Sequence, residues 1–194
     1  DGLSNLMDYG LTMDLVGYWQ FEEGSGTWAQ DSSGYGHTGA LWNGFDWTNG
    51  LYGGAVAFDG DQGTMTVWDT EALRVGYGGG DFSVAAWVKL TGPQSWGDNV
   101  LFFKSDGAYE DFYLSINSSY RVIGRVSTTS NLTTDASMGL EDQVCPGEWT
   151  HLAYVKEGGV LKLYMNGRLE GSVALSGQVL DNYGYWNFGG RLYF

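Results

Sequence analysis

The stretch "WTHLAYVKEGGVLKLYMNGRLEGSVAL", residues 149–175, indicates how the chain folds. Apolar and polar residues alternate through its three segments, as they do in half-buried β-strands. Asn166-Gly167 separates the second segment from the third, and a tight hairpin turn needs residues that accept a positive φ at both central positions. Glu157-Gly158-Gly159 separates the first two segments in a similar way. The stretch therefore predicts three consecutive antiparallel strands.

Strand patterns also fill most of the remaining sequence, and no window of about 11 residues or more carries a good helical period. Many short strands separated by glycine-rich turns are typical of β-sandwiches and jelly rolls. We expect an all-β fold of two antiparallel sheets packed as a jelly-roll sandwich. The other expected strands are 15–21, 54–58, 64–68, 81–90, 99–103, 111–117, 120–128 and a closing segment at 185–194.

Size and charge restrict the kind of protein this can be. The 194 residues suit one domain, and 43% of them are apolar, which is enough for a substantial core. The formal net charge is −14, so a nucleic-acid partner and an anionic membrane surface are both disfavoured. Cys145 is the one cysteine, which excludes an internal disulfide, and no apolar run approaches the roughly 18 residues of a membrane span. Membrane insertion is therefore not expected.

Six segments in this order resemble one family. They are "LVGYWQFEEGSGTWAQDSSGYGHTG" (15–39), "GLYGGAVAFDGDQGTMTV" (50–67), "DFSVAAWVK" (81–89), "EWTHLAYV" (148–155), "LKLYMNGRLEGS" (161–172) and "FGGRLYF" (188–194). Together they resemble the laminin-G-like jelly-roll domains of the concanavalin A-like lectin/glucanase superfamily. The resemblance implies one such domain over residues 15–194, preceded by an N-terminal extension at 1–14.

The sequence departs from this family at its end, because the chain stops at Phe194 before the family's usual last strand. The resemblance places that strand beside residues 15–21. There are three explanations for the missing strand: it is truncated in this chain, it is replaced by residues 1–14, or it is supplied by a partner. We expect the sheet edge near 15–21 to be covered by residues 1–14 or by another protein chain, because exposed edges recruit strands.

The glycine-rich loop "FEEGSGTWAQDSSGYGHTG", residues 21–39, has two interpretations. On its residues alone, Asp31 forms an Asx-turn that accepts backbone N–H groups, while the glycines supply positive φ angles. The resemblance implies instead a structural Ca²⁺, an ion that prefers oxygen ligands. Its expected ligands are the side chains of Asp31 and Glu23 and carbonyl oxygens of residues 33–37, including Gly34 and His37.

Catalysis is not expected. The superfamily includes β-glucanases with an E-x-D-x-x-E pattern on one strand, and retaining hydrolysis needs two carboxyl groups about 5 Å apart. No glutamate in this sequence has an aspartate two residues further on. The two histidines, His37 and His151, have no accompanying nucleophile motif such as G-x-S-x-G.

Aromatic residues are the candidates for sugar recognition, since a sugar offers a flat apolar face and hydroxyl groups. Each candidate has the alternative of simply packing over the rim of the core. Trp96 is the best of them because Gln94, Asp98 and Asn99 flank it. The resemblance places three other tryptophans, Trp19, Trp87 and Trp149, at buried structural positions. The carbohydrate-binding candidates are Trp96, Trp42, Trp47, Tyr109 and Trp186, with Trp42 and Trp47 expected in turn-like segments.

The sequence thus favours a non-catalytic, lectin-like module that binds a polysaccharide or glycan. We expect it to belong to a larger extracellular bacterial protein, secreted or held at the cell surface. One alternative is an adhesive or structural surface module that binds protein or no ligand. A third is a glycan-active enzyme with an unfamiliar site.

Overall fold

The computed structural model describes residues 15–92, 97–105, 110–130, 134–137, 143–180 and 183–189. Their regular structure is β-strand apart from one 3₁₀ turn, η1 (Glu71–Leu73). No helix in these ranges has the length and apolar character needed to cross a membrane. The expected extension at 1–14, the chain end at 190–194 and two candidate residues, Trp96 and Tyr109, lie outside the described residues.

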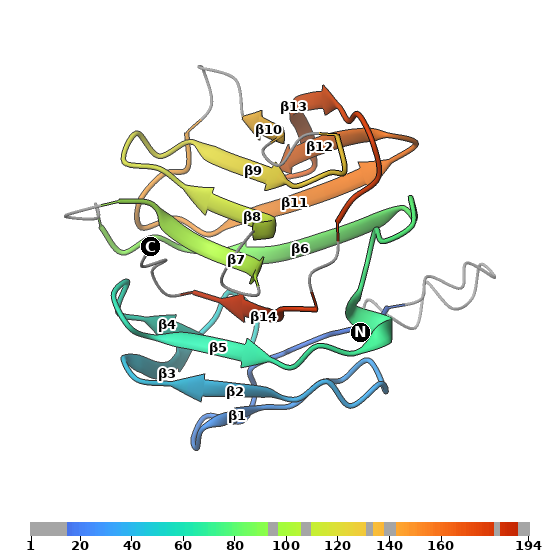
Figure 1. Cartoon of the computed structure of the whole chain (residues 1–194). Coiled ribbons are helices and arrows are strands. Elements are labelled where there is room, and N and C mark those ends of the chain that lie inside the picture. The colour runs from blue at the N-terminus through green and yellow to red at the C-terminus, as the bar shows by residue number, and fades with distance from the viewer. Residues whose placement is uncertain are drawn as a thin grey trace, which may run out of the picture.

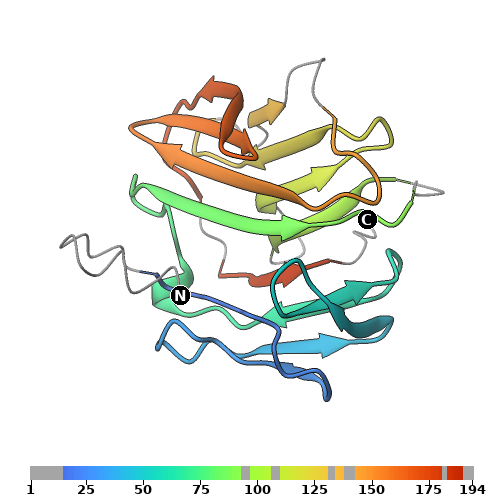
Figure 2. The same cartoon turned by 180° about the vertical axis from the view of Figure 1, so that it is seen from behind.

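The strands form a sandwich of two main antiparallel sheets, as the sequence predicted (Figure 1). The smaller sheet and the hairpin of β3 (Phe45–Asn49) and β4 (Gly54–Phe58) lie on one side of the large sheet (Figure 2). The smaller sheet has the order β13 (Arg168–Ala174), β12 (Val160–Met165), β11 (Thr150–Glu157) and β6 (Phe82–Val88). The large sheet has the order β1 (Trp28–Ala29), β2 (Gly39–Trp42), β5 (Thr64–Val67), β14 (Tyr185–Phe188), β7 (Asn99–Ser105), β8 (Glu110–Ile116), β9 (Val122–Val126) and β10 (Thr134–Ser137).

Both predicted hairpins of the meander are confirmed. The β12–β13 turn holds Asn166 at φ 50° and Gly167 at φ 81°, and the β11–β12 turn holds Gly158 at φ 55° and Gly159 at φ 81°. Positive φ at both central residues is the requirement of a type I′ turn, whose twist matches that of the flanking strands. These two turns set the register of β11, β12 and β13.

The core lies between the two main sheets and is rich in aromatic residues. Phe82 meets Phe112 edge to face with ring centroids 4.9 Å apart, and Tyr154 is fully buried with its hydroxyl donating to the Arg125 carbonyl oxygen at 2.7 Å. Gly124 makes room for Tyr154, because a Cβ added there would lie 2.3 Å from the tyrosine ring. Part of the aromatic content of the sequence therefore goes into the core of the sandwich.

The first part of the chain differs from the prediction. Residues 15–21 form no strand, and their one ladder contact is an isolated bridge between Trp19 and Asp31. Phe21 has φ 59°, which breaks an extended run at that point. The edge strand of the large sheet is β1 instead, so the edge expected at 15–21 is not formed by those residues. The sequence also missed β2 and β3, and so placed Trp42 and Trp47 in turns when both lie in strands.

Trp87 corrects a second expectation. On β6 it pairs in register with His151 of β11, and its side chain points outward and is 46% exposed. Its indole meets the His151 ring with centroids 5.2 Å apart and the Tyr52 ring at 6.4 Å. The outer face of the smaller sheet therefore carries an aromatic patch, Tyr52–Trp87–His151, where a buried tryptophan was expected.

Candidate functional site

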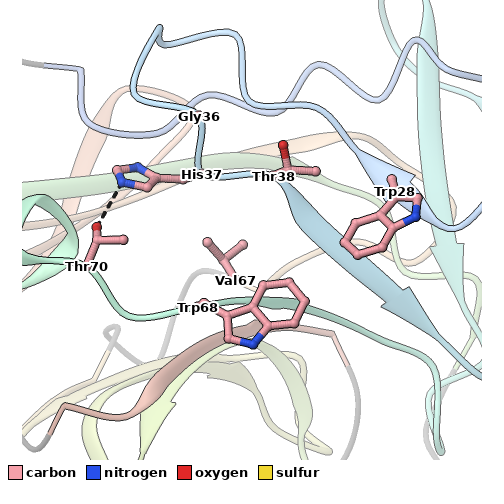
Figure 3. A pocket seen from close by; sticks show the side chains of 7 residues that line it. All are labelled: Trp28, Gly36, His37, Thr38, Val67, Trp68 and Thr70. Atoms are coloured by element: carbon pink, nitrogen blue, oxygen red, sulfur yellow. Dashed lines mark hydrogen bonds between the residues drawn. The ribbon is translucent and has the colours of Figure 1, made fainter.

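A hollow of about 250 Å³ opens on the large sheet, where β1, β2 and β5 run side by side. Figure 3 shows the two indole rings of Trp28 and Trp68 on one side of it, His37 and Thr70 on the other, and Val67 between them. The hollow is lined by Trp28, Gly36, His37, Thr38, Val67, Trp68 and Thr70.

Strand alternation turns both indoles outward. Trp28 precedes Ala29, which is fully buried, and Trp68 follows Val67, which is 1% exposed, so each tryptophan lies on the face opposite the core. The two indoles are 50% and 43% exposed, and they stack with centroids 6.2 Å apart and planes 27° apart. Ala40 lies opposite Trp28 on the intervening strand β2 and opposite Thr66 of β5, so the two indoles meet on a diagonal across β2.

His37 organises the polar side of the hollow and is itself nearly buried. Its Nδ1 lies 2.7 Å from the Val16 carbonyl oxygen, which accepts only, so Nδ1 carries the proton. In the neutral ring Nε2 then accepts a hydrogen bond from the Thr70 hydroxyl at 2.8 Å. Because that hydroxyl donates to His37, its remaining lone pairs are available to accept from a ligand. Thr38 adds a second hydroxyl, 3.5 Å from the Gln30 side-chain oxygen.

The loop below the hollow is fixed by Asp31, whose side chain is fully buried. Its Oδ1 accepts the backbone N–H groups of Tyr18 and Ser33, each at 2.9 Å. Its Oδ2 accepts the Ser33 hydroxyl at 2.7 Å and the His37 N–H at 2.9 Å. Burial alone would raise the pKa of Asp31, but the hydrogen bonds from Ser33, Tyr18 and His37 outweigh it and hold the pKa below its ordinary value.

This geometry does not fit Asp31 as a calcium ligand. A carboxylate offers about four lone-pair sites, and four protein donors already use them. The His37 carbonyl oxygen likewise accepts the Trp19 indole N–H at 2.8 Å. The Asx-turn interpretation therefore describes the loop, with Gly34 at φ 97° and Gly36 at φ 78° supplying the positive angles.

Glu23, the second expected ligand, has one oxygen in use and one without a partner. Its Oε1 accepts the Gln30 backbone N–H at 2.7 Å, while its Oε2 is buried and has no hydrogen-bond partner. A single oxygen is far from the six to eight that Ca²⁺ takes. Within the described part of the chain, no three acidic, histidine or cysteine residues gather as a metal site. Calcium binding with Asp31 and Glu23 as ligands stays a prediction, and it would require the loop to exchange these hydrogen bonds for the ion.

The structure does not bring the described sugar-binding candidates together. Trp42 is 50% exposed on β2, beyond Ala40 along the strand. Trp47 is half-buried, and its indole N–H donates to the Gly26 carbonyl oxygen at 2.9 Å. Trp186 is 4% exposed and packs in the core, with its N–H donating to the Leu73 carbonyl oxygen at 2.9 Å, so it cannot offer a ring face to a sugar.

The two tryptophans that line the hollow were missed by the sequence prediction. The alternation in "TMTVW" contained a signal for Trp68, since buried Met65 and Val67 leave Thr66 and Trp68 on the opposite face. Trp28 gave no such signal, because β1 has two residues and follows a glycine-rich loop.

A laminin G family model, described as the concanavalin A-like lectin/glucanases superfamily, matches residues 59–193. The chain belongs to this superfamily. The two-sheet sandwich, the meander of β11 to β13 and the antiparallel pairing throughout agree with that assignment. The sequence has no match among curated proteins.

Several solved structures share the superfamily fold with this chain. The binding domain of Paraclostridial Mosquitocidal Protein 1 has a TM-score of 0.70 and 15% identity, over 89% of this chain and 42% of that one. The binding domain of botulinum neurotoxin serotype D has a TM-score of 0.67 and 16% identity, over 83% and 40%. The chain thus spans about two fifths of the length of these toxin domains.

A third similar structure is Domain 4 of AbnA, an extracellular GH43 arabinanase from Geobacillus stearothermophilus, in complex with arabinotriose. Its TM-score is 0.58 at 20% identity, over 85% of this chain and 79% of that domain. At such identities the likeness concerns the fold alone, so the site must be argued from this chain's own residues.

Proposed function

We propose that this domain is a non-catalytic carbohydrate-binding module and that the hollow beside Trp28 and Trp68 is its sugar site. The observation that carries the proposal is the stacked pair of half-exposed indoles, 6.2 Å apart, beside the hydroxyls of Thr38 and Thr70. A sugar ring has C–H groups that pack on an aromatic face and hydroxyls that need polar partners at its edge. The hollow offers both within a space suited to a small ring.

The lining residues favour binding over hydrolysis. None of them carries a carboxylate, whereas glycoside hydrolysis generally uses two. His37 is held between Val16 and Thr70, and Asp31 below the hollow uses its oxygens within the loop. The groups that face the hollow are therefore indoles, uncharged hydroxyls and the His37 imidazole, whose two ring nitrogens both have protein partners.

The comparisons support a glycan as the partner at the level of fold. Domain 4 of AbnA was solved with arabinotriose, and the binding domain of botulinum neurotoxin DC was solved with SialylT. AbnA is also an extracellular enzyme with further domains. We propose the same kind of setting here, a module of a larger protein that is secreted or displayed at the cell surface.

Affinity electrophoresis against a panel of polysaccharides and a glycan array test this function. Trp28→Ala and Trp68→Ala should each weaken binding about tenfold, which corresponds to about 1.4 kcal/mol of lost stacking and burial. Trp87→Ala is the matched control, because that indole is similarly exposed but lies on the other sheet. Unchanged binding in both hollow variants contradicts the assignment of the site.

A surface that binds protein is the second candidate, and the patch Tyr52–Trp87–His151 favours it. Tyr52 is 77% exposed and Leu169, on the same sheet as Trp87, is 50% exposed. Large apolar side chains grouped on a solvent-facing sheet are common at protein interfaces. Loss of partner binding in Trp87→Ala alone would favour this candidate over the sugar site.

A further inference from the structure

The large sheet carries a second hollow, of about 310 Å³, lined by Ser105, Tyr183, Gly184 and Tyr185. Tyr185 begins β14 and pairs in register with Ser105 of β7. Trp186, the next residue, is buried against the core, so Tyr185 points to the opposite face and is 51% exposed. Tyr183 is 62% exposed.

The two hollows lie on the same face and toward the same end of the strands. β14 is also the neighbour of β5, and Trp186 pairs with Val67. The strands are antiparallel, so Tyr185, the residue before Trp186, lies opposite Trp68, the residue after Val67. Both side chains point away from the core. Trp68, Tyr185 and Ser105 therefore form a row that crosses the strands. Trp28 lies one row along, in register with Ala40 and Thr66, and extends this row to β1 through its stacking contact with Trp68.

The length of this row is set by the spacing of the strands. From β1 through β2, β5 and β14 to β7 there are four strand intervals. At about 4.8 Å each they span about 19 Å, which exceeds the size of a single sugar ring and suits a chain of several sugars.

The row and its surroundings are polar but largely uncharged. One row further along the strands, the Thr66 hydroxyl donates to the Asn187 side-chain oxygen at 2.9 Å. The Arg74 guanidinium lies over the Tyr183 ring, 4.3 Å from its centroid, and is paired with Asp69 at 2.6 Å. With a formal net charge of −14 on the whole chain, a polyanionic ligand would be repelled.

We infer that the ligand of the proposed sugar site is an extended, uncharged oligosaccharide that lies across the strands from β1 to β7. Trp28 and Trp68 hold one part of the chain, and Tyr185 with Tyr183 holds another. The module then recognises an internal stretch of a polysaccharide and not a single terminal sugar. This inference rests on the proposed function and adds the class of ligand to it.

Isothermal titration calorimetry with a length series tests the inference. The probes are linear arabino-, xylo- and cello-oligosaccharides, from the single sugar up to about six units. Wild-type affinity should rise at least tenfold from the single sugar to about four units, where the ligand fills the row, and then level off. Tyr185→Ala should abolish this gain and leave the affinity for the single sugar and the disaccharide unchanged.

Two variants separate the ring of Tyr185 from general effects. Tyr185→Phe keeps the aromatic face and should keep the gain with length. Tyr52→Ala removes an exposed tyrosine outside the row and should bind as wild type does. Circular dichroism melts of all variants show whether each one is folded.

The outcomes distinguish a failure of the extended-ligand inference from a failure of the proposed sugar-binding function. If affinity is independent of length while Trp28→Ala still weakens binding, the sugar site stands and the extended ligand is overturned. The same holds if Tyr185→Ala keeps the full gain with length. If wild type binds none of the three series and Trp28→Ala changes no interaction on a glycan array, both proposals fail.

Discussion

The indole rings of Trp28 and Trp68 stack 6.2 Å apart although β2 lies between their strands. The contact runs diagonally across β2, because Ala40, which has a short side chain, lies opposite Trp28 on one side and opposite Thr66, two residues before Trp68, on the other. We therefore expect the spacing of the two indoles to depend on Ala40, although this small apolar residue is not a candidate to bind the ligand itself.

Ala40→Leu tests this dependence without removing either tryptophan. A larger side chain should push the indoles apart and weaken glycan binding about tenfold, with a cost of about 1–3 kcal/mol in the free energy of unfolding from overpacking. Ala85→Leu is the control, because Ala85 is an exposed alanine on the smaller sheet. Titration calorimetry and urea unfolding measure the two effects. Normal affinity in Ala40→Leu would show that stacking of the two rings is not needed.

Asp31→Ala should destabilise the domain by about 3 kcal/mol or more. It removes the acceptor for the N–H groups of Tyr18, Ser33 and His37, and buried donors without partners are costly. In a protein of this size the melting temperature should fall by roughly 6–12 °C. Asp31→Asn should also destabilise, because its amide nitrogen cannot accept a hydrogen bond from Ser33 or His37.

Wild type and Asp31→Ala together also test the calcium prediction. Since the Asp31 oxygens are occupied by protein donors, EDTA and added Ca²⁺ should leave the melting temperature of the wild type unchanged. Asp31→Ala should melt low under both conditions. A rise with Ca²⁺ in the wild type that Asp31→Ala loses would show that the loop rearranges around the ion, because a ligand bound to the folded state alone stabilises it.

The acid stability of the domain should depend on Asp31. Hydrogen bonds hold its pKa below the ordinary value, so its contribution to stability is present above the unfolded pKa of about 3.9 and is lost as the pH falls through the lower folded pKa. The difference in unfolding free energy between wild type and Asp31→Ala should shrink below about pH 4. The pKa of Asp59 is also lowered, mainly by hydrogen bonds from the N–H groups of Asp61 and Gly63. Because both proteins contain Asp59, its contribution cancels in this comparison.

The parts of the fold that the sequence predicted well are those with local causes. Asn166-Gly167 and Gly158-Gly159 define their turns through their own backbone preferences, and the alternation in β11 and β12 follows directly from one buried face. These features need no knowledge of distant residues. The assignment to the sandwich class follows from the same signals.

The site was harder to predict because it depends on pairings far apart in the sequence. Trp28 belongs to a two-residue strand whose existence depends on β2, and Tyr185 reaches Trp68 only because β14 inserts between β5 and β7. Trp186 was expected among the sugar-binding residues, but on β14 it faces the core, while Tyr185 before it faces solvent. The sequence identified Asp31 as the residue that fixes the loop, and in the structure its carboxylate accepts hydrogen bonds from Tyr18, Ser33 and His37.

Thr70→Val tests the polar side of the hollow with little change in shape. The substitution removes the hydroxyl that donates to His37 Nε2 at 2.8 Å and leaves that nitrogen without this partner. The free energy of unfolding should fall by about 1–2 kcal/mol, and glycan affinity should fall several-fold because an acceptor at the rim is lost. Thr70→Ser keeps the hydroxyl and should stay close to wild type in both measurements. If Thr70→Val keeps wild-type affinity while Thr70→Ser weakens binding, the methyl group matters and not the hydroxyl, and the sugar would then contact this side of the hollow through packing alone.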